Sequence, residues 1–474
     1  MVKRPNIMLL MMDSVRAANL SCYGYGRVTT PNIDALAKES TLFERAISVG
    51  CWTLPVHASL FTGLYPLNHG LTVSKDALPD NFPTLAQQLK ELGYQTASFS
   101  SNAYVSEATR LTQGFDTVED IWRVSNPRGT RRTATSKLIG RLKGLGAAAR
   151  PAVRLVRALQ RARLIAKQRR NRRDKGARLA NKKIQAWLAN TWDPNKPFFV
   201  FVNYMETHEP YNPPYPYDQR FMPKRFSPWH VARVSSHKAI TAGPEKLRQE
   251  DLQILQALYD GELNYLDHQV GELVGFIQSR GILDDTVLVI TSDHGDSLGE
   301  HNHLGHRMTL YEQLVHVPLI IRYSPHFGAG AREPQMVSLI DLYPTFLELA
   351  GTDLSQTATN GFHSLAALPE MEKRPYLIAE NTAPKSQEGV TSRMLRTDRY
   401  KYIWKSDQQH ELYDLVQDPG ELVNLIAVRP EVARQMGKQL EAWHRSLENH
   451  AIETSQIEYD EVMVERLRQL GYVE

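Results

Sequence analysis

The stretch Thr286-Val287-Leu288-Val289-Ile290-Thr291-Ser292-Asp293-His294-Gly295 decides the fold of this 474-residue chain. A short β-branched run that ends in an Asp-His pair and a glycine is typical of a buried strand. Such a strand delivers its polar side chains at its carboxyl end, and open α/β sheets keep their chemistry at that edge. The stretch therefore predicts an α/β sheet with Asp293 and His294 as candidate metal ligands.

The start of the chain repeats this arrangement. Ile7-Met8-Leu9-Leu10-Met11-Met12 reads as a second apolar strand, and Asp13 follows it directly. Two carboxylates and an imidazole on neighbouring strand ends would form a site for a divalent metal ion.

Composition places the chain among ordinary soluble enzymes. It is 42% hydrophobic and 23% charged, and its length allows a large core with a smaller second domain. Cys22 and Cys51 are the two cysteines, too few for a disulfide scaffold, which favours a reducing compartment. No apolar run reaches the roughly 18 residues of a spanning helix, and the N-terminal run carries no cleavage signal. These features predict a cytoplasmic enzyme.

Strand and helix patterns alternate along most of the chain. This alternation predicts a largely parallel sheet with helices on both faces. The predicted strands also include 95–99, 198–202 and 317–321, and the predicted helices are 32–38, 85–92 and 252–279.

The pattern changes near residue 370, so we predict a catalytic domain over 1–370 and a subdomain over 371–474. In the second part, short strands are predicted at 376–379, 400–404 and 412–415, with a helix over 430–447. This composition of elements is typical of a small α+β unit.

Residues 123–183 are dense in Arg and Lys, and Asp174 is their only acid. We interpret them as a basic amphipathic helical insertion. It could be a solvated hairpin that covers the sheet or a partner subunit in a homo-oligomer. It could instead bind an anionic membrane surface and make the enzyme peripheral at a membrane. Nucleic acid is a weaker candidate, because no aromatic residues are interleaved between Val124 and Ile184.

A second helix start carries a candidate nucleophile. Thr53 and Pro55 open a helix that Gly63 closes, which places Thr53 at or beside the N-cap. There its oxygen faces the positive end of the helix dipole, a suitable place for a hydroxyl that a metal converts to an alkoxide. Without the acids and histidine at the strand ends, the same threonine would be read as a simple cap.

Together these segments resemble the sulfatase branch of the alkaline-phosphatase superfamily. The resemblance spans nearly the whole chain except the basic insertion. It implies an alkaline-phosphatase-like fold, a mixed, mostly parallel sheet sandwiched by helices with a small C-terminal α+β subdomain. The matching stretches are Pro5-Asn6-Ile7, Asp13-Ser14-Val15-Arg16, Tyr23-Gly24-Tyr25, Thr30 to Ala37, Thr53 to Pro66, Gln113 to Asp116, Pro197-Phe198-Phe199, Thr207 to Tyr211, Ser292 to Gly295, Gly299-Glu300-His301, Val317 to Ile320, Glu411 to Leu415, Asp418-Pro419 and Glu421.

The chain departs from that family at the nucleophile. Family sulfatases carry Cys or Ser in the pattern Cys-x-Pro-x-Arg, and the cysteine is oxidised to formylglycine. Here the positions read Thr53-Leu54-Pro55-Val56-His57, and Cys51 has no proline two residues later. Threonine cannot become formylglycine. A threonine nucleophile, like the Asp293-His294 pair, resembles the phosphodiesterase, phosphonate monoester hydrolase and phosphotransferase branches.

The resemblance also implies a ligand set. Asp13, Thr53, Asp293 and His294 would bind one divalent metal ion. Mixed oxygen and nitrogen ligands favour Mn²⁺ or Zn²⁺, while Mg²⁺ and Ca²⁺ stay possible. A second ion is not expected, because the pattern offers no obvious spare carboxylate.

The remaining site residues follow from the same comparison. His57 replaces a family arginine and could hydrogen-bond Thr53 or the ester. His208 matches a family histidine that contacts the ester group. His306 replaces a family lysine and could protonate the leaving group or bind a non-bridging oxygen. Asn102 is expected in the same pocket, and each histidine has a plain packing role as its alternative.

These observations predict a metal-dependent hydrolase or transferase of phosphate diesters or phosphonate esters that acts through a covalent Thr53 intermediate. The substrate would be a small-molecule, glycan or lipid ester. Three alternatives remain open: a sulfatase without formylglycine, a membrane-associated phospho-group transferase, and a binding module without catalysis.

Overall fold

The computed structural model describes residues 4–72, 76–124, 174–235, 243–306, 309–356, 362–368, 373–381, 390–448, 454–456 and 459–469, together with a few positions between 158 and 166. Most of the predicted basic insertion therefore lies outside the described residues, and the interpretations of it stay predictions. Across the described ranges, no helix is both long enough and apolar enough to cross a membrane.

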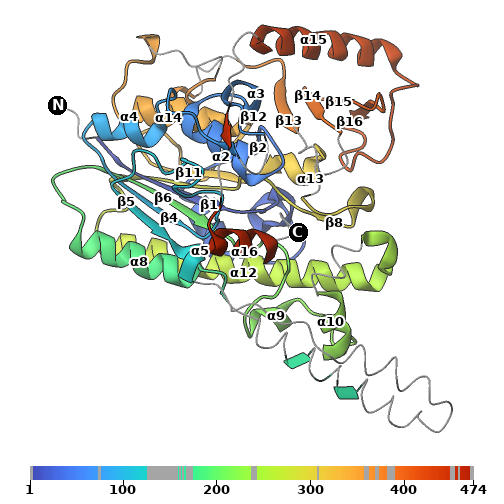
Figure 1. Cartoon of the computed structure of the whole chain (residues 1–474), viewed down its shortest axis with the longest axis horizontal. Coiled ribbons are helices and arrows are strands. Elements are labelled where there is room, and N and C mark those ends of the chain that lie inside the picture. Colours follow the sequence, from blue (N-terminus) through green and yellow to red (C-terminus); the bar gives the residue numbers. More distant parts are fainter. Residues whose placement is uncertain are drawn as a thin grey trace.

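A nine-stranded mixed sheet forms the centre of the molecule (Figure 1). The five strands β7, β1, β6, β4 and β5 run parallel to one another. Strand β11 is antiparallel to both of its neighbours, β7 and β2. The strand order is β10-β2-β11-β7-β1-β6-β4-β5, with β12 beside β2. The bounds are β1 Asn6–Met12, β2 Thr41–Ile47, β4 Gln95–Ser100, β5 Thr117–Asp120, β6 Phe198–Tyr204, β7 Thr286–Thr291, β10 His316–Val317, β11 Leu319–Arg322 and β12 Ala331–Ser338.

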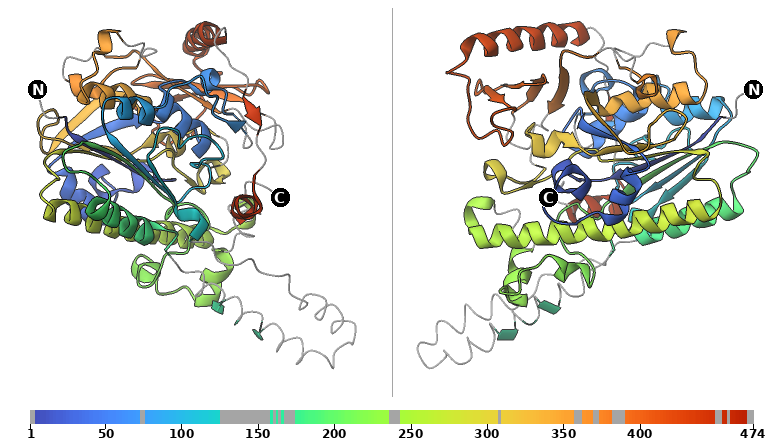
Figure 2. Two further views of the ribbon diagram at one scale, coloured as in Figure 1. Left: turned by 60° about the vertical axis from the view of Figure 1, so that its left-hand side comes forward. Right: turned by 180° about the vertical axis from the view of Figure 1, so that it is seen from behind.

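Strand β1 shows why the sheet is covered on both faces. Ile7, Leu9 and Met11 point into one apolar cluster, and the alternate residues Met8, Leu10 and Met12 point into the other. Each face is thus buried, as expected for a parallel sheet whose strands are apolar throughout. The first face is covered by α2 Thr53–Thr62, α4 Leu85–Glu91 and α14 Leu342–Leu349, and the second by α1 Pro31–Ala37, α8 Ala177–Asn190 and α12 Gln249–Ser279 (Figure 2). The predicted fold class is confirmed.

The single strand predicted over 317–321 is two short strands in the structure, β10 and β11. Pro318 separates them, because proline has no N–H to donate to a ladder.

A second, four-stranded antiparallel sheet follows, in the order β13-β14-β15-β16. Helix α15, Pro430–Glu448, packs against it. Strand β14 was not predicted, because its sequence, Ser392-Arg393-Met394-Leu395-Arg396, has no regular alternation of polar and apolar side chains. The strand bounds are β13 Leu377–Asn381, β14 Ser392–Arg396, β15 Tyr400–Lys405 and β16 Glu411–Asp414. The last described segment leaves this sheet: β17 Ser455–Gln456 pairs with β3 Asp76–Ala77, and α16 Glu461–Gln469 contacts α5 Ile121–Val124.

A buried ion cluster joins the second sheet to the part of the molecule built on the nine-stranded sheet. The Lys401 Nζ atom lies 2.8 Å from Glu421 and 3.2 Å from Glu312, the first residue of α13 Glu312–Val315. Arg396 donates to both oxygens of Glu312 at 3.0 Å. Burial would raise the pKa of Glu312, but the charges of Arg396 and Lys401 hold it well below its usual range. The cluster fastens the second sheet to the chain that follows His306.

We expect Lys401→Met to destabilise the protein by about 3–5 kcal/mol, because the substitution leaves the buried carboxylate of Glu421 without its cation and leaves Glu312 with Arg396 alone. Urea unfolding followed by circular dichroism measures the change. The control is Arg434→Met, which breaks a solvent-exposed pair with Glu431 and should have little effect. Equal stability of the two variants would contradict this role of the cluster.

Candidate active site

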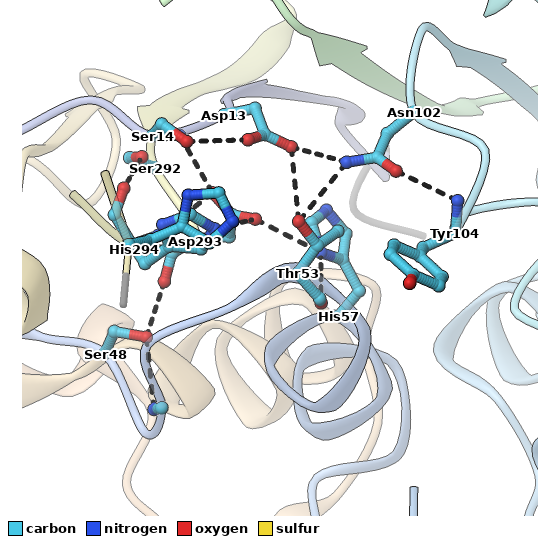
Figure 3. A network of polar contacts seen from close by, with 12 residues as sticks. Asp13, Ser14, Ser48, Thr53, His57, Asn102, Tyr104, Ser292, Asp293 and His294 are labelled. Carbon is cyan, nitrogen blue, oxygen red and sulfur yellow. Dashed lines mark hydrogen bonds and ion pairs between the residues drawn. The ribbon is translucent and has the colours of Figure 1, made fainter. Parts of the chain in front are cut away.

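The predicted metal ligands meet at the carboxyl ends of two adjacent strands (Figure 3). Asp13 follows β1, and Asp293 and His294 follow β7, its parallel neighbour. One ligand atom from each of the three side chains lies within 4.8 Å of the others, and all three residues are fully buried. The tertiary structure therefore brings together the trio that the sequence placed 280 residues apart along the chain.

A tight turn after β1 holds the two acids side by side. Ser14 has a left-handed backbone, with φ 63°, a conformation that costs energy for a residue other than glycine. This turn lets the Ser14 N–H donate to Asp293 at 3.3 Å and its hydroxyl donate to Asp13 at 3.0 Å. The Tyr259 hydroxyl in turn donates to the Ser14 carbonyl oxygen at 2.8 Å.

The orientation of His294 leaves one ring nitrogen for a ligand. Its Nδ1–H donates to the carbonyl oxygen of Gly295 at 2.9 Å, so Nε2 carries the lone pair, and that atom has no hydrogen bond. Gly295 is required here, since a Cβ atom at this position would lie 2.1 Å from the carbonyl oxygen of Gln313. That close approach allows the Gly295 N–H to donate to Leu314 at 2.8 Å.

Thr53 lies beside this trio. It is the first residue of α2, directly after the N-cap Trp52, as the sequence predicted. Its hydroxyl donates to Asp13 Oδ2 at 3.5 Å. The Asn102 side-chain amide donates to the same carboxylate oxygen at 2.7 Å and to the Thr53 hydroxyl oxygen at 3.2 Å (Figure 3). The Tyr104 N–H fixes that amide by donating to its oxygen at 2.9 Å. Asn102 is therefore in the expected pocket.

His57 packs behind Thr53 and does not contact its hydroxyl through a hydrogen bond. The His57 Nδ1–H donates to the Thr53 carbonyl oxygen at 2.9 Å, and its Nε2 accepts from Asn203 at 3.4 Å. The ring meets Phe61 and Phe201 edge to face. Of the two roles considered for His57, this geometry favours packing and orientation of the first turn of α2.

His208 and His306 stand together on the other side of the trio. Their ring centroids are 4.8 Å apart, and the His306 ring lies 4.7 Å from that of His294. Burial and the neighbouring His306 lower the pKa of His208 to about 4. Burial would also lower the pKa of His306, but a hydrogen bond from its Nδ1 to Asp296 at 3.1 Å and the charge of that carboxylate raise it to about 9. The pair therefore combines one neutral and one protonated imidazole.

Asp296 is a residue that the sequence analysis missed. It accepts from the Tyr211 hydroxyl at 2.7 Å while its other oxygen holds His306. Its position only three residues after Asp293 is the one feature of the sequence that could have pointed to it. Asp296 also corrects the statement that no spare carboxylate is present, because it forms a second potential metal-binding trio with His294 and His306.

Lys175 was also missed, and it holds the loop that carries His208. Its ammonium donates to the carbonyl oxygens of Glu206 at 2.7 Å and His208 at 2.5 Å, and pairs with Glu262 at 2.9 Å. Lys175 belongs to the C-terminal end of the predicted insertion. Sequence alone shows no reason to single out one lysine in so basic a segment.

The charge balance of the trio fits a divalent cation. Burial and the charge of Asp13 raise the pKa of Asp293. Two adjacent buried carboxylates are costly without a cation. In addition, Asp293 Oδ2 and His294 Nε2 are buried without a hydrogen-bond partner. Two carboxylates, one imidazole and one hydroxyl are a suitable donor set for such an ion.

In metal-free protein we expect His306 to titrate near pH 9, as measured by NMR of the imidazole protons. Asp296→Asn should lower this pKa strongly, whereas Asp284→Asn at an exposed position should not change it. Because the folded pKa exceeds the unfolded value of about 6.5, the stabilisation is complete below that pH and is lost as pH rises through about 9. An unchanged His306 pKa in Asp296→Asn would contradict this assignment.

Comparison with known proteins agrees with this geometry. The sulfatase family matches residues 5–352, and the family of N-sulphoglucosamine sulphohydrolase C-terminal domains matches residues 299–446. Arylsulfatase K of Mus musculus is 25% identical over 94% of this chain and 80% of its own length. The choline-sulfatase of Rhizobium meliloti is 25% identical over 89% and 82%, respectively.

A solved structure shares the fold. The phosphonate monoester hydrolase of Agrobacterium radiobacter superposes with a TM-score of 0.71 at 22% identity, covering 94% of this chain and 96% of that one. The match of one family over most of the chain and the strand-end trio lead to the same conclusion: the chain belongs to the sulfatase family of ester hydrolases.

Proposed function

We propose that this enzyme hydrolyses phosphate diesters or phosphonate esters, or transfers their phosphoryl group, through a covalent intermediate on Thr53. One observation carries the proposal: a threonine hydroxyl stands at the start of α2 where family sulfatases need an oxidisable cysteine, and it contacts Asp13 and Asn102. The structural likeness to a phosphonate monoester hydrolase supports the fold of such an enzyme.

Asp13, Asp293, His294 and Thr53 would hold one divalent metal ion, with Mn²⁺ or Zn²⁺ favoured by the mixed donors. When bound, the ion would lower the pKa of the Thr53 hydroxyl and neutralise charge on the phosphoryl oxygens.

The protein groups divide the first step between them. Thr53 Oγ attacks phosphorus, its proton passes toward Asp13 Oδ2, and the bond to the leaving oxygen breaks in line with the new one. The Asn102 side-chain amide donates to the Thr53 hydroxyl oxygen and so orients the nucleophile. His306, protonated and held by Asp296, donates a proton to the leaving oxygen. Such a reaction needs positioning and charge neutralisation more than other covalent chemistry.

In the second step water or an acceptor alcohol attacks the phosphothreonine, the bond between phosphorus and Thr53 Oγ breaks, and Asp13 returns the proton to that oxygen. His306, now neutral, accepts the proton of the attacking oxygen, as microscopic reversibility requires. His208, whose pKa is lowered to about 4, stays neutral and orients the ester through a hydrogen bond. The acceptor decides between hydrolysis and transfer.

Sulfate-ester hydrolysis without formylglycine is the second candidate. It is favoured by the relatives, which are named arylsulfatase K and choline-sulfatase. A transferase at an anionic membrane surface stays a prediction, because the basic insertion lies mostly outside the described residues.

We expect Thr53→Ala to lower kcat/KM by about a thousandfold or more on the preferred substrate, because the covalent route is lost. The assay compares aryl esters of phosphate monoester, phosphate diester, phosphonate monoester and sulfate with Mn²⁺ or Zn²⁺ added. Dominant diester or phosphonate turnover that Thr53→Ala abolishes supports the proposal. Dominant sulfate turnover would favour the second candidate, and full activity of Thr53→Ala would contradict both.

We expect about one metal ion per chain by elemental analysis, and a rise in melting temperature on adding the ion, because the folded state alone forms the site. His294→Ala and Asp293→Asn should lose both effects. His268→Ala, an exposed histidine of α12, is the matched control. A second ion that is lost in Asp296→Asn while the first ion stays bound would support another site at His294, Asp296 and His306. Unchanged metal binding in His294→Ala would contradict the ligand set.

A further inference from the structure

The C-terminal helix α16 packs against the body of the molecule that contains the central sheet. It contacts α5, and Arg123 of α5 pairs with Asp460 at 2.8 Å just before α16 begins. Met463 and Leu467 of this helix are buried in the main apolar cluster. In Figures 1 and 2 the helix lies next to α5, away from the second sheet that precedes it in the chain.

Arg466 on this helix is a buried cation. Its side chain is only 7% exposed, and its Nε atom is buried with no hydrogen-bond partner. Within the described ranges, its guanidinium forms no hydrogen bond and no ion pair. A guanidinium offers five N–H donors and stays charged, so its burial in this way is energetically unfavourable.

The nearby acid does not neutralise this charge. Glu206 acts on Arg466 electrostatically, but the two side chains form no ion pair. The Glu206 carboxyl group instead accepts from the Ala177 N–H at 2.8 Å. Burial and the neighbouring Asp174 raise the pKa of Glu206 well above its usual range, which favours its neutral form. Arg466 is therefore left without an ion-pair partner within the described ranges.

Glu206, which acts electrostatically on Arg466, lies at the same sheet edge as the reacting groups. Asn102 follows β4, while Glu206 and His208 follow β6, its parallel neighbour. Gly176 packs between the end of β4 and α5, because a Cβ atom there would lie 2.6 Å from the Ser101 hydroxyl and 2.9 Å from Ile121 of α5. The helix that carries Arg466 packs on this same α5.

We propose that Arg466 determines specificity by binding a second anionic group of the substrate, a carboxylate, phosphate or sulfate separate from the ester at Thr53. The inference rests on the proposed function for the place of the ester. A guanidinium binds such oxyanions through paired N–H donors, which adds directionality to charge. The preferred substrates are then esters that carry a further acidic substituent.

A series of competitive inhibitors of increasing length tests this proposal. Phosphonoacetate, 3-phosphonopropionate and 4-phosphonobutyrate are compared with ethyl-, propyl- and butylphosphonate of matched length, against turnover of bis(4-nitrophenyl) phosphate. The phosphonate group occupies the ester position. We expect the carboxylate to reach Arg466 in only one of the three compounds, the one whose spacer has the right length. For that length we expect the carboxylate to lower the inhibition constant about tenfold or more, as a charged hydrogen bond would.

Variants on one helix separate Arg466 from general charge effects. In Arg466→Gln the inhibition constant of the alkylphosphonate divided by that of the matched carboxylated phosphonate should fall to about one. In Arg466→Lys this ratio should lie between one and the wild-type value. Arg468→Gln, which removes an exposed arginine paired with Glu465, should keep the full ratio. Inhibition by the alkylphosphonates should be the same in all four proteins.

Stability provides an independent readout. Because the Arg466 charge has no partner in the folded protein, Arg466→Met should have an equal or higher melting temperature. A fall of several degrees would show a structural partner and overturn the proposal. So would equal inhibition constants for carboxylated and plain phosphonates at every length. If neither series inhibits and no ester is turned over, the proposed function fails, and this inference fails with it.

Discussion

The site depends on two buried carboxylates held side by side, Asp13 at the end of β1 and Asp293 at the end of β7. Their charges repel in a buried region, so the fold must supply compensation. Part of it is local: the strained Ser14 turn directs an N–H and a hydroxyl at the two acids, and Asn102 donates to Asp13. This compensation is incomplete, because Asp293 Oδ2 and His294 Nε2 have no hydrogen-bond partner. A cation would satisfy both atoms.

Around this pair the protein sorts its histidines by their surroundings. His57 is fixed against a backbone carbonyl and two phenylalanines, whereas burial keeps His208 neutral and Asp296 keeps His306 protonated. Residues of one type thus differ in their contacts and in their charge state. The histidines differ because each has a different nearest carboxylate and different hydrogen bonds, whereas the imidazole ring is the same in all three.

Segments distant in the chain complete the site. The chain after His306 is held by the buried cluster of Lys401, Glu312 and Glu421, so the second sheet supports the segment that follows the His306 loop. Lys175 fastens the loop of His208 from the end of the insertion. Helix α16 returns from the second sheet and places Arg466 near Glu206. The second sheet and the C-terminal segment therefore contribute to the geometry of the catalytic body.

The sequence by itself determined the fold class and the chemistry-bearing residues at the strand ends. Apolar runs that end in Asp13 and in Asp293-His294 can form only a sheet covered on both faces, and parallel strands present their ends at one edge. Thr53 was recognisable from its place at a helix start. Asp296, Lys175 and Arg466 were not, because nothing in their local sequence differs from an ordinary surface charge. Their roles depend on burial and on partners that lie far away in the chain. Only the tertiary structure decides which charges are neutralised and which are left for a ligand.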